Sequence, residues 1–257
     1  MSADVQVPQV TLTGVTKTYG SNPPVLRNID LSIAKGEFVS LIGPSGCGKS
    51  TLLKLISGLT SATSGDILVD GMTPLNARET VSYIFQDATL LPWRTVSSNV
   101  GLGLELEHVS REVRQGKVQS LLELVGLTHV ARSYPRQLSG GMKMRVSVAR
   151  ALATRPRLLL MDEPFGALDE MTRDRLNEEL LRLRAEQNWT AVFVTHSVAE
   201  AVFLSTRVIV LAPSPGRIAQ EIPIPLPFPR SRETRESPQF ESLVTEVSRA
   251  LRGVHAA

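Results

Sequence analysis

The stretch that decides the fold is Gly43-Pro44-Ser45-Gly46-Cys47-Gly48-Lys49-Ser50-Thr51. Before it, residues 38–42 form an apolar run that indicates a buried strand, and after it residues 50–57 have the pattern of a helix that Gly58 ends. Glycines in a strand-to-helix loop let successive backbone N–H groups turn towards one anion, and the helix N-terminus adds the positive end of its dipole. The stretch therefore predicts a phosphate-binding loop.

The same stretch matches the P-loop pattern G-x-x-x-x-G-K-[ST] and lies between the strand and the helix that the pattern requires. In such a loop Lys49 places a point charge on the β- and γ-phosphates of a nucleotide, and the Ser50 hydroxyl can ligate Mg²⁺. A chance glycine-rich turn, the alternative, would not explain the flanking elements. Cys47 is interpreted as a small residue whose backbone N–H matters, without thiol chemistry. The residues predicted to bind the phosphates are Gly43, Pro44, Ser45, Gly46, Cys47, Gly48, Lys49, Ser50 and Thr51.

A second motif lies at residues 158–164, which read LLLMDEP. Its apolar run delivers two adjacent carboxylates, Asp162 and Glu163, to the C-terminal end of a strand, which is where ligands bind in open parallel sheets. Asp162 is placed to assist the Mg²⁺ shell. Glu163 then points elsewhere and is expected to polarise the attacking water. Alone this motif is weak, but together with the P-loop it indicates a nucleoside triphosphatase.

Apolar strands that alternate with helical segments organise the chain. Strands are expected at residues 10–19, 26–33, 38–42, 66–69, 158–161, 191–195 and 208–211, and helices at 50–57, over most of 97–155, and at 172–186. Such alternation predicts an α/β fold with a largely parallel sheet covered on both faces. The order is a β-rich beginning, a core, a helical insertion, and the core resumed.

Composition fits a globular protein. The 257 residues are 42% hydrophobic and 21% charged, and no run approaches the roughly 18–20 apolar residues of a membrane-spanning helix. No secretory signal is visible, and the single cysteine fits a reducing compartment, so a cytoplasmic location is expected. The net charge of +3 comes from basic residues dispersed among acidic ones, which does not favour a nucleic-acid partner.

The C-terminal part differs in composition. Four prolines at alternate positions, from Pro223 to Pro229, exclude a helix and favour an extended strip. Beyond Pro238 the apolar residues fall on one helical face, which is expected to pack on the domain or on a partner. These residues are Phe240, Leu243, Val244, Val247 and Leu251.

Residues 138–142, which read LSGGM, resemble the signature sequence of ABC ATPases and lie where that family places it, between the P-loop and the acidic strand. A helix expected over 143–153 would aim its N-terminus at an anion. The commonest family form has Gln at the position of Met142, so the departure concerns one side chain at the helix start. The residues that the resemblance implies for binding ATP are Ser139, Gly140 and Gly141, together with Tyr19 and Asp162.

The resemblance also implies individual roles. Tyr19 lies where the family places a ring that stacks on adenine, although a core or edge aromatic would also fit. Gln86 matches the glutamine loop, and His196, directly after a predicted strand, matches the switch histidine that contacts the γ-phosphate. Residues 167–169 look like the D-loop, which crosses the dimer interface. The implied catalytic residues are Glu163, His196 and Gln86, and the implied Mg²⁺ ligands are Ser50, Gln86 and Asp162.

The resemblance covers about residues 10–215 and implies a P-loop NTPase core of the ABC ATPase type. That fold has an N-terminal antiparallel β subdomain and an inserted α-helical subdomain. The ATPase domain is expected at residues 1–230, with the helical subdomain at about 87–155. Residues 231–257 are expected to form a C-terminal extension with an amphipathic helix.

In this family the signature residues complete the site of the opposite subunit, so two copies are expected to clamp two Mg-ATP and to separate after hydrolysis. The pore would be formed by separate transmembrane permease subunits, which would hold the chain at the inner face of the cell membrane. Residues 86–96, 162–169 and 207–218 resemble the nitrate/sulfonate/taurine importer branch, which a solute-binding protein feeds. Within the first of these stretches Leu91, Pro92 and Trp93 are expected to contact the permease, with ordinary burial of the Trp as the alternative.

The expected function is therefore that of the ATP-binding and ATP-hydrolysing subunit of an importer for a small solute. A heterocyclic vitamin precursor is an alternative cargo, because the sequence does not encode the solute. A soluble non-transport ABC ATPase is an alternative function, but such proteins resemble tandem cassettes or carry long coiled-coil insertions. Neither feature is visible in 257 residues.

Overall fold

The structure is a computed structural model that describes residues 7–166 and 168–255. The strands are β1 (Val10–Lys17), β2 (Leu26–Ile33), β3 (Phe38–Ile42), β4 (Ser64–Val69), β5 (Val81–Ile84), β6 (Leu158–Asp162), β7 (Thr190–Val194), β8 (Arg207–Ala212) and β9 (Arg217–Pro223). The longer helices are α1 (Lys49–Ile56), α5 (Arg111–Leu124), α6 (Gly140–Ala153), α7 (Glu170–Gln187) and α10 (Pro238–His255). The shorter ones are α2 (Pro74–Ala77), α3 (Val96–Val100), α4 (Leu102–Leu106), α8 (Val198–Leu204) and α9 (Arg232–Arg235), with 3-10 turns at Arg78–Thr80, Thr128–Val130 and Pro135–Gln137.

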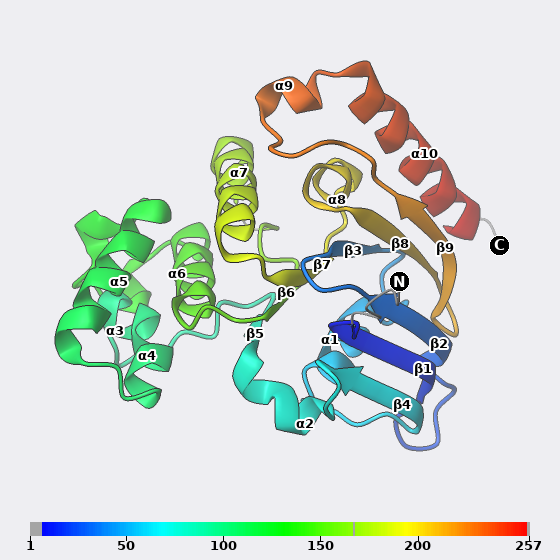
Figure 1. The fold of residues 1–257 in the computed structure, drawn as a ribbon, viewed down its shortest axis with the longest axis horizontal. Helices are drawn as coiled ribbons and strands as arrows, with labels where there is room; N and C mark the ends of the chain where they lie inside the picture. Colours follow the sequence, from blue (N-terminus) through cyan, green and yellow to red (C-terminus); the bar gives the residue numbers. More distant parts are fainter. Residues whose placement is uncertain (1–6, 167, 256–257) are drawn as a thin grey trace, which may run out of the picture.

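Two sheets organise these elements (Figure 1). The smaller sheet is antiparallel, in the order β2-β1-β4, and the larger has the order β5-β6-β7-β3-β8-β9. In the larger sheet β5, β6, β7, β3 and β8 run parallel, and β9 pairs antiparallel with β8. This confirms the predicted α/β fold with an antiparallel sheet near the N-terminus. No strand was expected at β5 or at β9. Each has one fully buried side chain, Ile84 in β5 and Ile222 in β9, so its apolar periodicity is too weak to indicate a strand.

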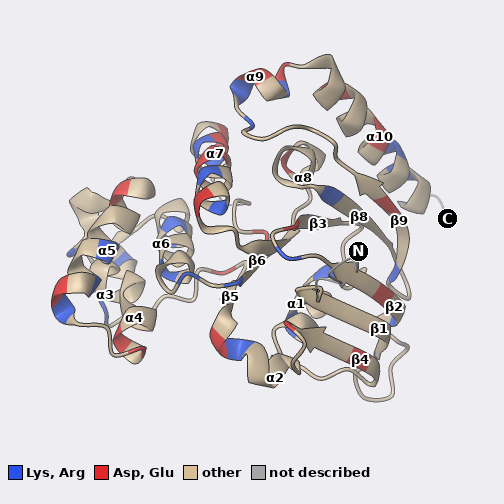
Figure 2. Cartoon of the chain, in the orientation of Figure 1, with Lys and Arg blue, Asp and Glu red and all other residues tan. Residues whose placement is uncertain are grey.

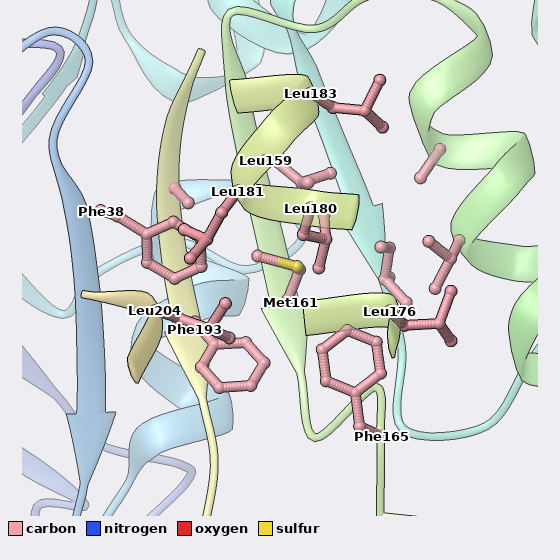
Figure 3. Packing of buried hydrophobic residues seen from close by; sticks show 14 of the residues in the cluster. Phe38, Leu159, Met161, Phe165, Leu176, Leu180, Leu181, Leu183, Phe193 and Leu204 are labelled. Atoms are coloured by element: carbon pink, nitrogen blue, oxygen red, sulfur yellow. The ribbon is translucent and has the colours of Figure 1, made fainter. Parts of the chain in front are cut away.

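The parallel strands bury residues on both faces and so divide the core into two layers. On one face Val39 and Leu41 of β3 pack with α1 and the small sheet. On the other face Phe38 packs edge-on against Phe193 of β7 at 6.0 Å between ring centroids, in the layer that α7 covers. Figure 3 shows this second layer, where leucines of α7 lie against the sheet. Consecutive residues on a strand therefore pack against different helices, one on each face of the sheet.

The helices α3 to α6 gather at the β5 edge of the larger sheet, apart from the other helices (Figure 1). They pack on one another through buried residues such as Val100, Leu104, Leu122 and Val148. The domain boundaries stay a prediction, but this group lies within the range expected for the helical subdomain.

The chain after β9 crosses back over the larger sheet and ends in α10 (Figure 1). Phe240, Leu243 and Val247 of α10 are buried in the same apolar layer as Phe38 and Phe203 of α8. The apolar face predicted for this segment therefore packs on the domain.

Charged residues of both signs are interspersed on the surface, as Figure 2 shows along α7. There Arg182 pairs with Glu179 and Glu186, each at 2.8 Å, three and four residues away along the helix. Within the described ranges, no helix has both the length and the apolar character needed to cross a membrane.

Candidate functional site

The glycine-rich loop joins β3 to α1 with a backbone that glycine makes possible. Gly48 has φ of 97° where α1 begins, and a Cβ there would lie 2.5 Å from Cδ2 of Leu26, so any other residue would be strained and would collide. Lys49 follows, and its Nζ donates to the carbonyls of Gly43 at 2.8 Å and Pro44 at 2.9 Å. The loop thus holds its lysine over the start of the helix, which is where an anion binds most strongly.

Cys47 of this loop is buried, with its Sγ 3.8 Å from Nζ of Lys49. Burial raises the pKa of the Cys47 thiol, and the nearby charge of Lys49 only partly opposes this. The thiol is therefore neutral at pH 7 and a weak nucleophile. The interpretation of Cys47 as a small residue whose backbone N–H matters, without thiol chemistry, stays a prediction.

The acid at the end of β6 lies against the start of α1. The Ser50 hydroxyl donates to Oδ1 of Asp162 at 2.9 Å, and the Tyr83 hydroxyl donates to Oδ2 at 3.3 Å. Burial raises the pKa of Asp162, while the two hydrogen bonds lower it. Burial and the Asp162 charge raise the pKa of Tyr83, so its hydroxyl keeps its proton. Sequence reasoning assigned Tyr83 no role, because nothing in the local pattern shows which strand neighbour its side chain reaches.

The oxygen atoms of Ser50 and Asp162 suit Mg²⁺, a hard cation that prefers oxygen ligands. Among residues 7–166 and 168–255, no three His, Cys, Asp or Glu side chains gather into a fuller metal cage. Such a sparse protein contribution is typical of Mg²⁺ bound together with nucleotide phosphates, because the phosphates supply the other ligands. The two side chains therefore fit the predicted ion.

Glu163 and His196 meet at the C-terminal ends of β6 and β7. Glu163 has a left-handed backbone with φ of 48°, and its N–H donates to the Val194 carbonyl at 3.0 Å. Its Oε2 lies 3.5 Å from Nδ1 of His196, whose side chain is 68% exposed. A non-glycine residue in this region costs about 1–3 kcal/mol and is typical of functional sites. The turn places the Glu163 carboxylate beside His196, whereas the Asp162 carboxylate contacts Ser50 and Tyr83.

A buried network fixes the loop that carries His196. The Thr195 hydroxyl donates to Oε2 of Glu200 at 2.6 Å and accepts from the Ser197 N–H at 3.0 Å. The other Glu200 oxygen lies 3.6 Å from Nε of Arg173, and Arg173 donates to the Leu168 carbonyl at 2.9 Å. The start of α7 is therefore tied to the start of α8. Sequence reasoning missed Glu200 and Arg173, since their contact joins two helices without a shared motif.

The signature residues lie where α6 begins. The Ser139 side chain caps the helix by accepting the Met142 N–H at 3.3 Å, and Ser139 and Gly140 are exposed. The rest of α6 is anchored, because Met144 and Val148 are buried. An exposed helix N-terminus with a serine cap can bind an anion presented from outside.

Tyr19 and Gln86 are the remaining residues predicted for the nucleotide site. Tyr19 is 41% exposed, and Nζ of Lys17 lies 4.7 Å from its ring centroid. Gln86 is exposed two residues after β5. The structure thus brings Lys49, Ser50, Asp162, Glu163 and His196 to one edge of the sheet. The second member of the predicted 167–169 loop, Leu168, is buried, and Ala167 lies outside the described residues.

The loop before α3 holds an exposed aromatic residue on a fixed backbone. Trp93 is 71% exposed, so the alternative of ordinary burial is wrong. The buried Asn99 ties this loop together, since its Nδ2 donates to the carbonyls of Leu91 and Arg94, each at 3.1 Å, and its Oδ1 accepts the Leu91 N–H at 2.8 Å. Nearer the core, Arg150 donates to the Thr89 carbonyl at 3.0 Å. A rigid loop that exposes a tryptophan is typical of a docking surface.

A family of known proteins and several individual proteins are similar to this chain. The family described as ABC transporter matches residues 26–166. The bicarbonate transport ATP-binding protein of Synechococcus elongatus is 47% identical over 93% of this chain, which covers 37% of that longer protein. The aliphatic sulfonates import ATP-binding protein of Bacillus cereus is 43% identical over 92% of this chain and 94% of its own length.

A solved structure has the same architecture. It is the dimeric post-hydrolysis state of an ATP-binding cassette bound to ADP and Pi, with 35% identity and a TM-score of 0.78. The alignment covers 84% of this chain and 98% of that one.

Proposed function

The chain belongs to the ABC transporter family, and from this membership we propose that it hydrolyses ATP to drive import of a small solute of the nitrate, sulfonate or taurine type. The observation that carries the proposal is the meeting of Lys49, Ser50, Asp162, Glu163 and His196 at the C-terminal edge of the larger sheet. The relatives named for sulfonates and bicarbonate support an oxyanion as cargo.

Binding falls to the P-loop side of this cluster. The backbone of residues 43–51 and the start of α1 would hold the phosphates, with Lys49 moving its ammonium from the loop carbonyls to the β- and γ-phosphates. Ser50 and Asp162 would hold Mg²⁺, assisted by Gln86, and the ion would neutralise charge on the phosphates. Tyr19 would offer its exposed ring to adenine.

Hydrolysis falls to the pair at β6 and β7. Glu163 would accept a hydrogen bond from the attacking water and polarise it, since its carboxylate is partly exposed and lies beside His196. His196, 3.5 Å away, would donate to the γ-phosphate oxygen and keep Glu163 oriented. The network of Thr195 and Glu200 behind it would limit how far the histidine can move.

The second half of each site would come from another copy of the chain. Ser139, Gly140 and Gly141 present an exposed helix N-terminus, which suits the γ-phosphate of an ATP held by the partner's P-loop. The dimeric relative supports this arrangement. Leu91, Pro92 and Trp93 would receive the permease, and a solute-binding protein would deliver the cargo to that permease.

Glu163→Gln tests the proposal, because it keeps shape and hydrogen bonding but removes the base. We expect ATP binding within a few-fold of wild type, hydrolysis at least about a hundredfold slower, and a stable ATP-bound dimer in size-exclusion chromatography. Glu241→Gln, an exposed change on α10, is the matched control and should behave as wild type. Wild-type turnover in Glu163→Gln would refute Glu163 as the base.

A further inference from the structure

Tyr83 reaches the predicted metal ligand because of the way β5 pairs with β6. In this parallel pair Tyr83 lies opposite Leu160, and Asp162 is two residues further along, so all three side chains share one face of the sheet. This is the face that α1 covers and to which Ser50 belongs. A tyrosine side chain is long enough to lean across to the next residue on its neighbour's face, and here its hydroxyl lies 3.3 Å from Oδ2 of Asp162.

The ring of Tyr83 is held in this position. It stacks on Phe85, with 4.2 Å between ring centroids and 28° between the ring planes. It also packs, partly buried, against the apolar layer that contains Leu158 and Leu160. A ring fixed on two sides presents its hydroxyl in one direction, so little conformational entropy is lost in making the bond.

The two oxygens of Asp162 therefore have separate donors on separate elements. Ser50 of α1 holds Oδ1 at 2.9 Å, and Tyr83 of β5 holds Oδ2. A carboxylate held at one oxygen can still rotate about its terminal bond, whereas one held at both cannot. The lone pairs of Asp162 that remain free then point in a fixed direction. An octahedral ion such as Mg²⁺ requires its ligands to be oriented in this way.

We propose that Tyr83 is a positioning residue for the Mg²⁺ of the bound nucleotide, acting through the carboxylate of Asp162. The proposal rests on the proposed function, since it concerns the same site. It also gives β5 a specific part, because the strand that carries Tyr83 leads directly into Gln86, the other residue of this edge expected near the ion. A shift of that loop would therefore reach the metal through two side chains of one segment.

Tyr83→Phe tests this with minimal change, because it removes the hydroxyl and keeps the ring on Phe85. The measurement is the dissociation constant of the full chain for the non-hydrolysable analogue AMP-PNP, by titration calorimetry, in excess Mg²⁺ and in excess EDTA. We expect the tightening caused by Mg²⁺ to be about three- to tenfold smaller in the variant, the range for one outer-shell hydrogen bond. Binding in EDTA should stay within twofold of wild type.

Tyr134→Phe is the matched control, since Tyr134 is an exposed tyrosine outside the site and should leave both constants unchanged. Equal Mg²⁺ tightening in Tyr83→Phe and wild type would overturn the positioning role. So would equal weakening with Mg²⁺ and with EDTA, which would indicate a packing role. Absence of any Mg²⁺ tightening in wild type would overturn the Mg²⁺ part of the proposed function and this inference with it.

Discussion

Arg230 is the residue whose replacement should most disturb the domain outside its nucleotide site. Its guanidinium is buried, and Nη1 donates to the carbonyls of Val202 at 3.0 Å, Phe203 at 2.8 Å and Ser205 at 2.8 Å. These carbonyls lie at the C-terminal end of α8, where the helix itself provides no N–H groups to donate to them. The informative change is Arg230→Met, which keeps length and loses every donor.

The geometry sets the size of the effect. Nη2 of Arg230 also donates to the carbonyls of Leu226 at 3.0 Å and, more weakly, Ile224 at 3.4 Å. Because Nη1 shares its two hydrogens among three carbonyls, the contacts amount to about three full hydrogen bonds. At about 1–1.5 kcal/mol for each of these bonds from a charged donor, the cost is about 4 kcal/mol. The methionine recovers about 1 kcal/mol by burying its own apolar surface. We expect a net loss of about 3 kcal/mol in the free energy of unfolding.

Charge does not complicate the measurement at neutral pH. Burial lowers the pKa of Arg230 to about 10, so the group is still charged at pH 7. The folded pKa lies below the unfolded one, so above about pH 10 the unfolded state binds more protons than the folded state, and stability rises with pH there. Below it, the difference between Arg230→Met and wild type should not vary with pH.

Urea unfolding followed by circular dichroism measures this loss, which should lower the midpoint by about 1 M. Hydrogen exchange adds a local readout: amides of α8 should lose more protection than those of α6. Arg230→Lys keeps the positive charge but cannot reach both sets of carbonyls. Its urea midpoint should therefore lie between those of wild type and Arg230→Met. A midpoint for Arg230→Met within about 0.2 M of wild type would refute the reasoning.

Two further changes test other parts of the molecule. Asp70→Asn removes the partner of Lys35 and Arg157, each 2.7–2.8 Å from the Asp70 carboxylate, whose pKa these hydrogen bonds lower. The change should lower the free energy of unfolding, measured with urea at pH 7, by about 1 kcal/mol. This difference from wild type should disappear as the pH falls from about 4, where carboxyls of the unfolded chain titrate, through the lower pKa of folded Asp70. A difference at pH 3 equal to that at pH 7 would contradict the prediction. Trp93→Ala should reduce transport in reconstituted complexes at least about tenfold with basal ATPase activity unchanged, while Leu68→Ala, an exposed change on β4, leaves both intact. Equal loss of both activities in Trp93→Ala would indicate a folding role.

Seven of the nine strands, all but β5 and β9, and the P-loop edge could be predicted because their signals are local. Residues 38–51 contain a buried strand, the loop and the helix start in one continuous stretch, and residues 158–163 place two acids directly after another buried strand. In a parallel sheet the ends of such strands meet at one edge, so Ser50 and Asp162 were expected to be near each other although 112 residues separate them.

The side-chain contacts behind that edge could not be predicted. Tyr83 and Asp162 are 79 residues apart, and whether they touch depends on β5 pairing with β6 in one register. The bond of Arg230 to Phe203 depends on the strip after β9 crossing over α8. Such contacts follow from how finished elements pack, and periodicity within one segment carries no information about them.

The two ends of α8 show how the C-terminal segment and the nucleotide site are connected. A buried arginine without a carboxylate partner would be costly, but the C-terminus of a helix supplies carbonyls and the negative end of a dipole. Arg230 therefore acts as a cap for α8 supplied from outside the helix. The same short helix begins with Ser197, directly after His196, and its first turn holds Glu200 against Thr195. Because α8 is only seven residues long, loosening its Arg230 end should let the histidine loop move, so we expect the strip after β9 to help position His196.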